Sequence, residues 1–434
     1  MSTISQPIPA SPSTVTCVEN EDPHLFQRAR TWWTLLALFL MAQGNGLFTK
    51  QDKLYYSLKT TSEDSTGALL AVTVVMLLII AALMRKRVHL IFRLMLEQKA
   101  ILAFSLLAFA SILWSQEPQL TLRHSTVLFF YFGFAWYFAT EYSFADQMRL
   151  ILCLGFVAAA GSIFMALVLP QYGIAVGGEW KGIFGQKNRL GLGIFYLFSG
   201  LPFRLAVTGR GLINLVFQAT LPICLILLSQ SKTSLIMTAV IVGVRIFGPF
   251  VTQGRNYQLP FRIYLSVVAV ATTVLLATFG RDIVLPLLGR DSSLTGRTDS
   301  WGLLLTFARR HLWVGYGYQA FWTGTGDSLS AVKSIGAAMH GADSGYLDTL
   351  LQFGVVGIGM LLLVLFMTIR DFIRVLHAPP VPRAAYWSMG VIIATFIGSS
   401  TEALFLITTG ISTFVFVVAC ADLRNLTTAS TGDL

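Results

Sequence analysis

Eight basic side chains stand in polar segments that separate long apolar runs of this chain. They are Arg123, Lys187, Arg189, Lys232, Arg290, Arg297, Arg309 and Arg310. The planar guanidinium fork of arginine suits the oxygens of a phosphate group. Arg297, in the segment LTGRTDSW at 294–301, is a better candidate than the adjacent pair Arg309 and Arg310, whose spacing is typical of a solvated helix face. For any one of these cations the alternative is a side chain that snorkels to a membrane surface.

Three further ionisable residues, His340, Asp343 and Asp348, lie in the segment AMHGADSGYLDTLLQFGVVG at 338–357. A histidine titrates near neutral pH, so it can take a proton from an attacking hydroxyl group. A carboxylate can take that proton as well, or it can orient the histidine. The alternative is a loop histidine that only makes hydrogen bonds.

The composition indicates that membrane helices position these residues. The chain of 434 residues is 55% hydrophobic and 12% charged, whereas roughly a quarter of a soluble domain is charged. A span needs about 20 mostly apolar residues. Twelve runs qualify, near 31–48, 66–84, 100–114, 124–140, 149–169, 188–203, 212–228, 233–249, 262–279, 344–369, 384–400 and 403–421. The sequence therefore predicts an all-α polytopic membrane protein with about 12 transmembrane helices.

The cysteines and histidines give no sign of a metal centre. The four cysteines form no C-x-x-C pair, and the six histidines are dispersed without metal-ligand spacing. The net charge of +10 is spread over short connections, which membrane topology explains better than nucleic-acid binding. We therefore expect no metal, no cofactor and no nucleic-acid partner.

The distribution of lysine and arginine orients the chain in the membrane. With the N-terminus inside, the inner segments hold 17 basic residues and the short outer loops hold 8, so the positive-inside rule places both termini in the cytoplasm. The predicted organisation is a cytoplasmic tail at 1–30, transmembrane helices 1–9 at 31–279, a long outer loop at 280–343, transmembrane helices 10–12 at 344–421 and a cytoplasmic tail at 422–434.

The outer side collects the polar segments that topology does not explain. These are 115–123, 170–189, 229–232, 280–343 and the turn near Glu402. Helical spacing of apolar residues predicts a surface helix at 298–312. The aromatic residues of the following turn WVGYGYQAFW at 313–322 are expected to anchor at the interface, and stacking on sugar is the alternative. We infer one extracytoplasmic site to which these segments contribute.

Six motifs together resemble the O-antigen ligase and polysaccharide polymerase (Wzy-type) superfamily. They are LWSQEPQLTLRHS (113–125), KGIFGQKNRLG (181–191), SQSKTSL (229–235), SSLTGRTDSW (292–301), WVGYGYQAFW (313–322) and ADSGYLDTLLQFGVVG (342–357). Within that superfamily the sequence is most similar to exopolysaccharide polymerases of the succinoglycan type.

The resemblance implies a GT-C-like, metal-independent, inverting glycosyltransferase of the bacterial inner membrane, with a periplasmic active site. Its partners would be an undecaprenyl-diphosphate-linked glycan donor, a glycan acceptor, membrane lipids, and chain-length regulator and export proteins. Arg297 matches an arginine of the family's long loop, and Arg123 and Arg189 fall in matching motifs. With Lys187, Lys232 and Arg290 they would hold the diphosphate.

One position departs from the family pattern. The family commonly has His-Asn-x-Tyr-Leu where this chain has Asp343-Ser344-Gly345-Tyr346-Leu347. Either His340, one helical turn earlier, is the base, or Asp343 takes that role.

Two other functions compete with a polymerase. An O-antigen ligase would move the glycan to lipid A–core instead of another repeat unit. A lipid-linked glycan transporter would instead carry charges along a path within its spans, whereas these charges gather on one side of the membrane.

Overall fold

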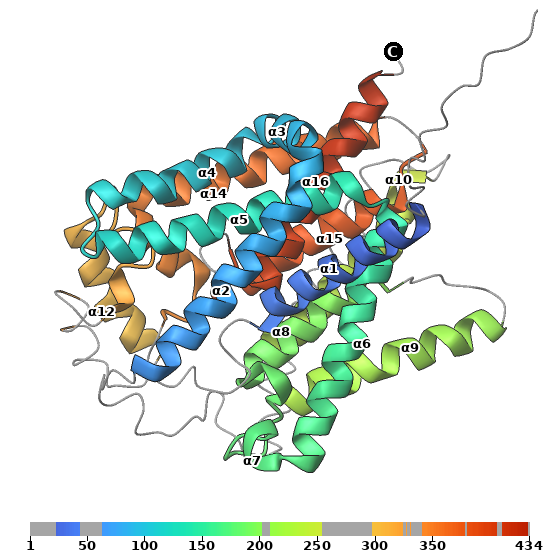
Figure 1. Ribbon diagram of the computed structural model, residues 1–434, viewed down its shortest axis with the longest axis horizontal. Helices are drawn as coiled ribbons and strands as arrows, with labels where there is room; N and C mark the ends of the chain where they lie inside the picture. Colours follow the sequence, from blue (N-terminus) through green and yellow to red (C-terminus); the bar gives the residue numbers. More distant parts are fainter. Residues whose placement is uncertain are drawn as a thin grey trace, which may run out of the picture.

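Helices make up nearly all of the regular structure in the computed structural model of the protein (Figure 1). The structure describes residues 23–43, 63–201, 209–253, 297–323, 327, 330, 341–377, 380–405 and 410–432. Within these ranges the β pairing consists of one isolated bridge, between Ile174 and Trp180. The prediction of an all-α protein is confirmed for the part that the structure describes.

Eleven helices follow predicted apolar runs. They are α1 (Pro23–Gln43), α2 (Glu63–Met84), α4 (Lys99–Ala110), α5 (Pro118–Glu141), α6 (Phe144–Val168), α8 (Lys187–Phe198), α9 (Gly209–Ser229), α10 (Lys232–Gln253), α14 (Gly345–Leu376), α15 (Arg383–Gly398) and α16 (Ile411–Gly432). The remaining run, 262–279, lies outside the described residues, and so does most of the predicted outer loop. Twelve spans therefore stay a prediction.

Four described helices are long and apolar enough to cross a membrane. They are α6, residues Lys232–Pro249 of α10, α14, and residues Ile411–Ala429 of α16. Residues Lys99–Leu113 and Gln218–Ser229 form apolar helices that are shorter than the length of about 20 residues that a span needs. These helices support the prediction that the chain is a membrane protein.

Shorter helices lie between the long ones. They are η1 (Arg85–Arg87), α3 (Val88–Glu97), η2 (Ser111–Leu113), α7 (Pro170–Gly173), η3 (Gly182–Phe184), α12 (Arg297–Arg310) and η4 (Phe321–Thr323). The surface helix predicted at 298–312 corresponds to α12. None of the twelve predicted runs corresponds to α3, whose 10 residues are too few for a span and follow a cluster of three basic residues.

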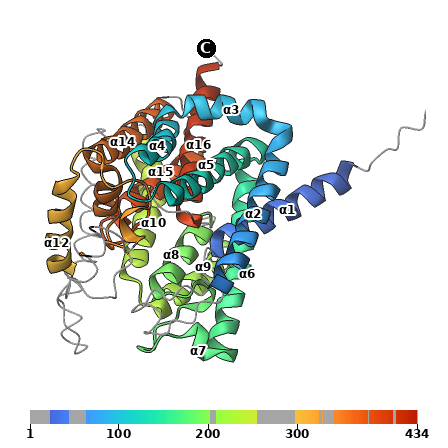
Figure 2. The ribbon, with the colours of Figure 1, turned by 60° about the vertical axis from the view of Figure 1, so that its left-hand side comes forward.

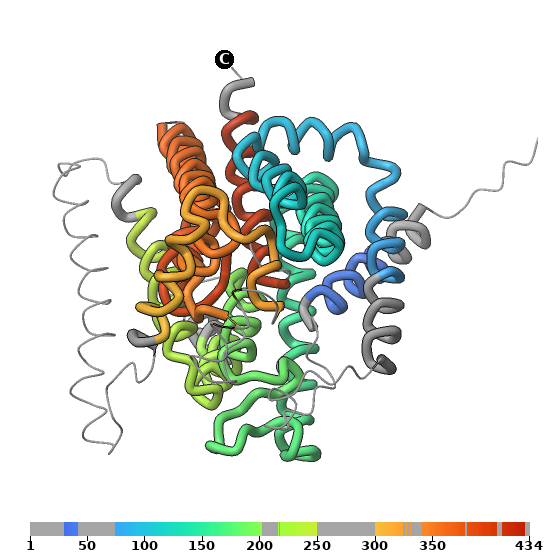
Figure 3. The backbone as a smooth tube through the Cα atoms, turned by 90° about the vertical axis from the view of Figure 1, so that its left-hand side faces the viewer, coloured from blue at the N-terminus to red at the C-terminus, as the bar shows by residue number. Residues whose placement is uncertain are grey.

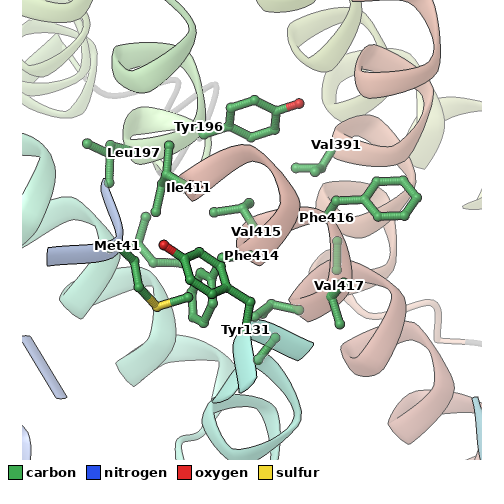
Figure 4. Packing of buried hydrophobic residues seen from close by; sticks show 14 of the residues in the cluster. Met41, Tyr131, Tyr196, Leu197, Val391, Ile411, Phe414, Val415, Phe416 and Val417 are labelled. Carbon is green, nitrogen blue, oxygen red and sulfur yellow. The ribbon is translucent and has the colours of Figure 1, made fainter. Parts of the chain in front are cut away.

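The main core surrounds α16. Residues Val415, Phe416 and Val417 are at most 1% exposed, as expected for a helix that is apolar on all sides and buried in a bundle. Figure 4 shows Phe414 and Val415 of α16 close to Met41 of α1, Tyr131 of α5 and Tyr196 of α8. Figure 3 shows α16 in red between α14 in orange and the cyan pair α4 and α5.

A second, smaller core joins α12 to the first turns of α14, at the edge of the molecule (Figure 2). It contains Leu304 and Phe307 of α12, Tyr316 and Phe321 of the following loop, and Leu351 of α14. This core fixes the loop that leads out of α12 against α14.

Candidate functional site

The candidate site centres on the first turn of α14, which begins two residues after Asp343, one of the two candidates for the base. Asp343 has a φ of 47°, in the left-handed region that aspartate and asparagine tolerate better than other side chains. Ser344 caps the helix, because its side chain accepts a hydrogen bond from the Leu347 N–H. The Gly345 N–H donates to the carbonyl oxygens of Ser399, at 2.7 Å, and of Glu402, at 3.0 Å. The turn after α15 therefore holds the backbone next to Asp343.

Glu402 in that turn also binds the first turn of α8. The Asn188 side-chain N–H donates to Oε1 of Glu402 at 2.5 Å. The neighbouring Lys187 forms an ion pair with Glu179 at 3.1 Å. Since the Glu402 carbonyl oxygen bonds Gly345 and its carboxylate bonds Asn188, one residue connects the starts of α8 and α14.

The first turn of α10 lies at the same end of the bundle. The hydroxyl groups of Thr233 and Thr401 are 2.8 Å apart, so α10 begins beside the same turn. Lys232 is the first residue of α10 and is exposed. The N-termini of α8, α10 and α14 thus meet around residues 399–402, and the positive ends of their dipoles add to the charge of the basic residues there.

A loop between α12 and α14 is inserted into α14. Gly354 interrupts that helix with a φ of 63° and a ψ of −157°. Across the interruption, Val355 and Val356 donate their N–H groups to the carbonyl oxygens of Leu312 and Trp313, at 2.8 and 3.2 Å. In return, the carbonyl oxygens of α14 residues 351 and 352 accept from the N–H groups of residues 316 and 317. The loop thus replaces two helical hydrogen bonds, so α14 can break without leaving buried polar groups unpaired.

The segment 111–121 holds the other side of the inserted loop. Trp114 donates its indole N–H to the Val314 carbonyl oxygen at 2.9 Å. The Thr121 hydroxyl donates to the Tyr318 carbonyl oxygen at 2.9 Å, and the Tyr318 N–H donates to the Ser111 hydroxyl at 3.0 Å. Three of the motifs, at 113–125, 313–322 and 342–357, therefore meet in one assembly.

Replacing Gly354 by alanine is expected to destabilise this assembly. A Cβ atom at Gly354 would collide with the backbone of Trp313, and the backbone dihedrals of Gly354 cost other residues on the order of 1–3 kcal/mol. Thermal unfolding of the purified protein in detergent should show a clearly lowered midpoint. Gly359→Ala is the matched control, because a Cβ atom there meets open space in the same helix. Equal midpoints for the two variants would contradict the inserted-loop geometry.

Asp348 lies one turn into α14 and is 3% exposed. Its Oδ1 accepts hydrogen bonds from the indole N–H of Trp322, at 2.9 Å, and from the Ala342 N–H, at 3.2 Å. On the other side of the same peptide segment, the Ala342 carbonyl oxygen accepts the indole N–H of Trp301 at 2.7 Å. Two tryptophans and one carboxylate thus hold the residues immediately before Asp343.

The contact of Trp301 also places α12. Arg297 is the first residue of α12, one helical turn before Trp301. Because Trp301 bonds the backbone of residue 342, the start of α12 lies beside the peptide segment that leads to Asp343. This is the arrangement that the two motifs at 292–301 and 342–357 require if they serve one site.

The structure brings together only part of the predicted site. Lys187, Arg189 and Lys232 lie in the first turns of α8 and α10, around the turn at 399–402 that also holds α14, and Arg189 is exposed. Arg123 lies in α5, two residues after Thr121, and is half-buried. No hydrogen bond or ion pair of the described residues joins Arg123 to Asp343. His340 and Arg290 lie outside the described residues.

The aromatic residues at 313–322 correct one expectation. They were expected to anchor at the membrane interface, but Tyr316, Tyr318 and Phe321 are at most 1% exposed. Burial, together with the Asp327 carboxylate that accepts its hydroxyl hydrogen bond at 2.8 Å, raises the pKa of Tyr316. Only Trp313 of these aromatics is largely exposed, at 72%. The expectation was wrong because contacts with α14 and with segment 111–121 bury the loop.

The sequence placed the turn near Glu402 on the outer side, but it indicated no individual role for Asn188, Glu402 or Trp322, which organise the site. Their roles depend on contacts across 214 positions, for Asn188 and Glu402, and across 26, for Trp322 and Asp348. The sequence did indicate that Asp348, the partner of Trp322, has a contact or a function, because an ionisable residue at the start of an apolar run usually has one.

Comparison with known proteins is consistent with these motifs. Residues 217–362 match the family described as O-Antigen ligase. The chain is also 28% identical, over 286 residues, to the exopolysaccharide production protein ExoQ of Rhizobium meliloti (strain 1021). That similarity covers 61% of this chain and 63% of the relative, so it spans less than two thirds of either protein. The resemblance inferred from the six motifs is confirmed.

Proposed function

From this resemblance to the O-antigen ligase family, and to a protein of exopolysaccharide production, we propose that the protein is a membrane glycosyltransferase. It joins undecaprenyl-diphosphate-linked oligosaccharide repeat units into exopolysaccharide at the periplasmic face of the inner membrane. The resemblance supplies the substrate class. The contacts of Glu402 with α8 and α14 support the arrangement of the candidate residues.

The proposed reaction exchanges one C–O bond for another. The oxygen of an acceptor sugar hydroxyl attacks the anomeric carbon of the donor glycan, and the bond from that carbon to the diphosphate breaks. Undecaprenyl diphosphate leaves with the bonding electrons, and the hydroxyl proton passes to His340 or Asp343. A single displacement of this kind inverts the anomeric centre.

The basic residues would stabilise the leaving diphosphate. Negative charge grows on that group as the bond breaks, and fixed cations lower the barrier where the charge develops. Arg297, with Arg123, Lys187 and Arg189, would supply this charge, and Lys232 and Arg290 would extend the cationic surface.

The observation that carries the proposal is the double role of Glu402. Its carbonyl oxygen binds the first residue of α14, and its carboxylate binds Asn188, which stands between Lys187 and Arg189. A candidate base and candidate diphosphate ligands are therefore attached to one turn of the chain.

Product sizing in vitro tests the proposal. The purified protein is reconstituted in vesicles with lipid-linked repeat units, and the glycan products are separated by length. A polymerase yields a ladder of repeat lengths with the repeat units alone. Products that form only when lipid A–core is added would show a ligase, the alternative that the family description favours. Glycans of unchanged length that cross the vesicle membrane would show a transporter, and either result would overturn the proposal.

Asp348 is expected to act as a positioning residue for this site. Asp348→Ala removes the acceptor of the Ala342 and Trp322 N–H groups, which costs about 1–3 kcal/mol for a buried unpaired donor and loosens the segment before Asp343. We expect the rate of repeat-unit transfer to fall about tenfold with little change in KM. Asp348→Asn keeps an acceptor oxygen and should recover most of the rate. A merely structural role predicts that both variants lose rate only in proportion to lost folded protein.

A further inference from the structure

A cavity of about 190 Å³ lies between α4, α14 and α16, outside the site described above. Its lining includes Lys99 and Ile101 of α4, Arg370 and Asp371 of α14, and Arg424 of α16. The volume is below the roughly 300 Å³ of pockets for drug-sized ligands, so it suits a small group.

The cavity stands at the opposite end of the bundle from the candidate site. Gly345 and Arg370 belong to the same helix and are 25 positions apart. At about 1.5 Å per residue, and with the break at Gly354 between them, the separation is at most roughly 37 Å, which is comparable to the hydrocarbon thickness of about 30 Å. The two locations therefore face opposite surfaces of the membrane.

The lining changes from charged to apolar along each helix. Arg370 and Asp371 stand near the end of α14, whereas Met367 and Val364 lie one and two turns deeper. On α16, Arg424 is followed inward by Leu423 and Cys420, and on α4 Lys99 is followed inward by Ile101. An occupant with a polar head at the membrane surface and an apolar part inside matches this order.

The charges of the lining favour an anionic head. Asp371 already pairs with Arg370 at 2.8 Å and with Arg424 at 3.3 Å, and Glu97 pairs with Arg93 at 3.0 Å. Lys99 is exposed and forms no ion pair within the part of the chain that the structure describes. Arg424 is engaged as well, because its Nε lies 3.7 Å from Oε2 of Glu97. Arginines thus neutralise both acidic groups, and Lys99 remains as a cationic donor for a ligand.

The neighbouring helix α3 places this end of the bundle at a lipid surface. It ends two residues before Lys99, and its residues Val88, Phe92 and Leu96, four positions apart, are each about half exposed. The basic residues Arg85, Lys86 and Arg87 directly precede it. A short helix with an apolar exposed stripe and basic residues is typical of the membrane interface with anionic lipids.

We propose that this cavity binds the headgroup phosphate of an anionic membrane phospholipid. Lys99 contacts the phosphate, and the acyl chains follow the apolar wall formed by Ile101, Met367 and Val364. The bound lipid joins α4, α14 and α16 at the membrane surface opposite the candidate site. This proposal does not depend on the glycosyltransferase function.

Lipid titration of the full-length, delipidated protein tests the site. Native mass spectrometry compares phosphatidylglycerol with phosphatidylcholine of the same acyl chains, and a third sample contains inorganic phosphate as competitor. We expect phosphatidylglycerol to bind more tightly, and Lys99→Ala to weaken it about fivefold, as one basic residue near a membrane surface contributes. Lys99→Glu should weaken it further.

Arg374→Ala is the matched control, because Arg374 is exposed on α14 one turn beyond Arg370 and does not line the cavity. Its affinity for phosphatidylglycerol should equal that of the unaltered protein. Equal binding of the two lipids, or an equal loss in the Lys99 and Arg374 variants, would overturn the proposal. Full displacement of the lipid by inorganic phosphate would overturn it as well, because the site would then recognise free phosphate.

Discussion

Arg297→Ala is expected to abolish polymer formation while leaving the amount of protein in the membrane unchanged. Arg297 begins α12, whose Trp301 is bonded to the segment before Asp343, so the loss removes a cation from the start of a helix that contacts this segment. Loss of one donor to a developing negative charge costs about 10²–10³-fold in rate. The measurement is the initial rate of repeat-unit transfer in reconstituted vesicles, together with immunoblots of the membrane fraction.

Arg309→Ala provides the comparison for this variant. Arg309 belongs to the same helix but stands in its last turn and is exposed, so its removal should leave the rate within about twofold. Arg297→Lys should restore only part of the rate, because a lysine offers a point charge instead of a fork of donors. Full-length polymer from Arg297→Ala would remove Arg297 from the diphosphate site.

The second large effect concerns the proposed base. Replacing the residue that accepts the hydroxyl proton should slow transfer about 10²–10⁴-fold, whereas replacing its neighbour should cost much less. His340→Gln and Asp343→Asn distinguish the two candidates. Asparagine suits this test because it tolerates the left-handed backbone of Asp343 about as well as aspartate does, so the carboxylate is removed without new strain.

The dependence of rate on pH gives an independent measurement for the same pair. The variant that lacks the base should lose the acidic limb of its kcat/KM profile, and the other should keep it. Near-normal rates for both single variants would show that neither residue accepts the proton.

Much of the helical framework was predictable because its signal is local. A run of apolar residues specifies a membrane helix without reference to the rest of the chain, and for this reason the predicted run at 344–369 corresponds to α14. The break at Gly354 was not predictable, because an isolated glycine in an apolar run is usually tolerated without interruption. What opens α14 there is a loop about 40 positions upstream, and periodicity carries no information about it.

For the candidate site too, features that depend on neighbouring residues were predictable, and features that depend on distant contacts were not. The motifs include the first turns of α8, α10 and α14 and the start of α12, and their role in a site stays a prediction. Side-chain type alone did not reveal that Glu402 connects two of these helices, because that role needs both its backbone carbonyl and its carboxylate. Nor did it show that the aromatics near Tyr316 fill a core instead of meeting lipid.

The loop inserted at Gly354 also has a consequence for the order in which the protein is assembled. The N–H groups of residues 355 and 356 and the carbonyl groups of residues 351 and 352 find their partners in residues 312–317. The bilayer core contains no water that could form hydrogen bonds with these groups. The α14 helix therefore cannot satisfy them without the loop. Ribosomal synthesis runs from the N-terminus, so residues 312–317 emerge first and are present when α14 enters the membrane. If the chain were divided between residues 312–317 and α14, and the C-terminal piece were made first, α14 would enter the membrane without the loop that completes its hydrogen bonds.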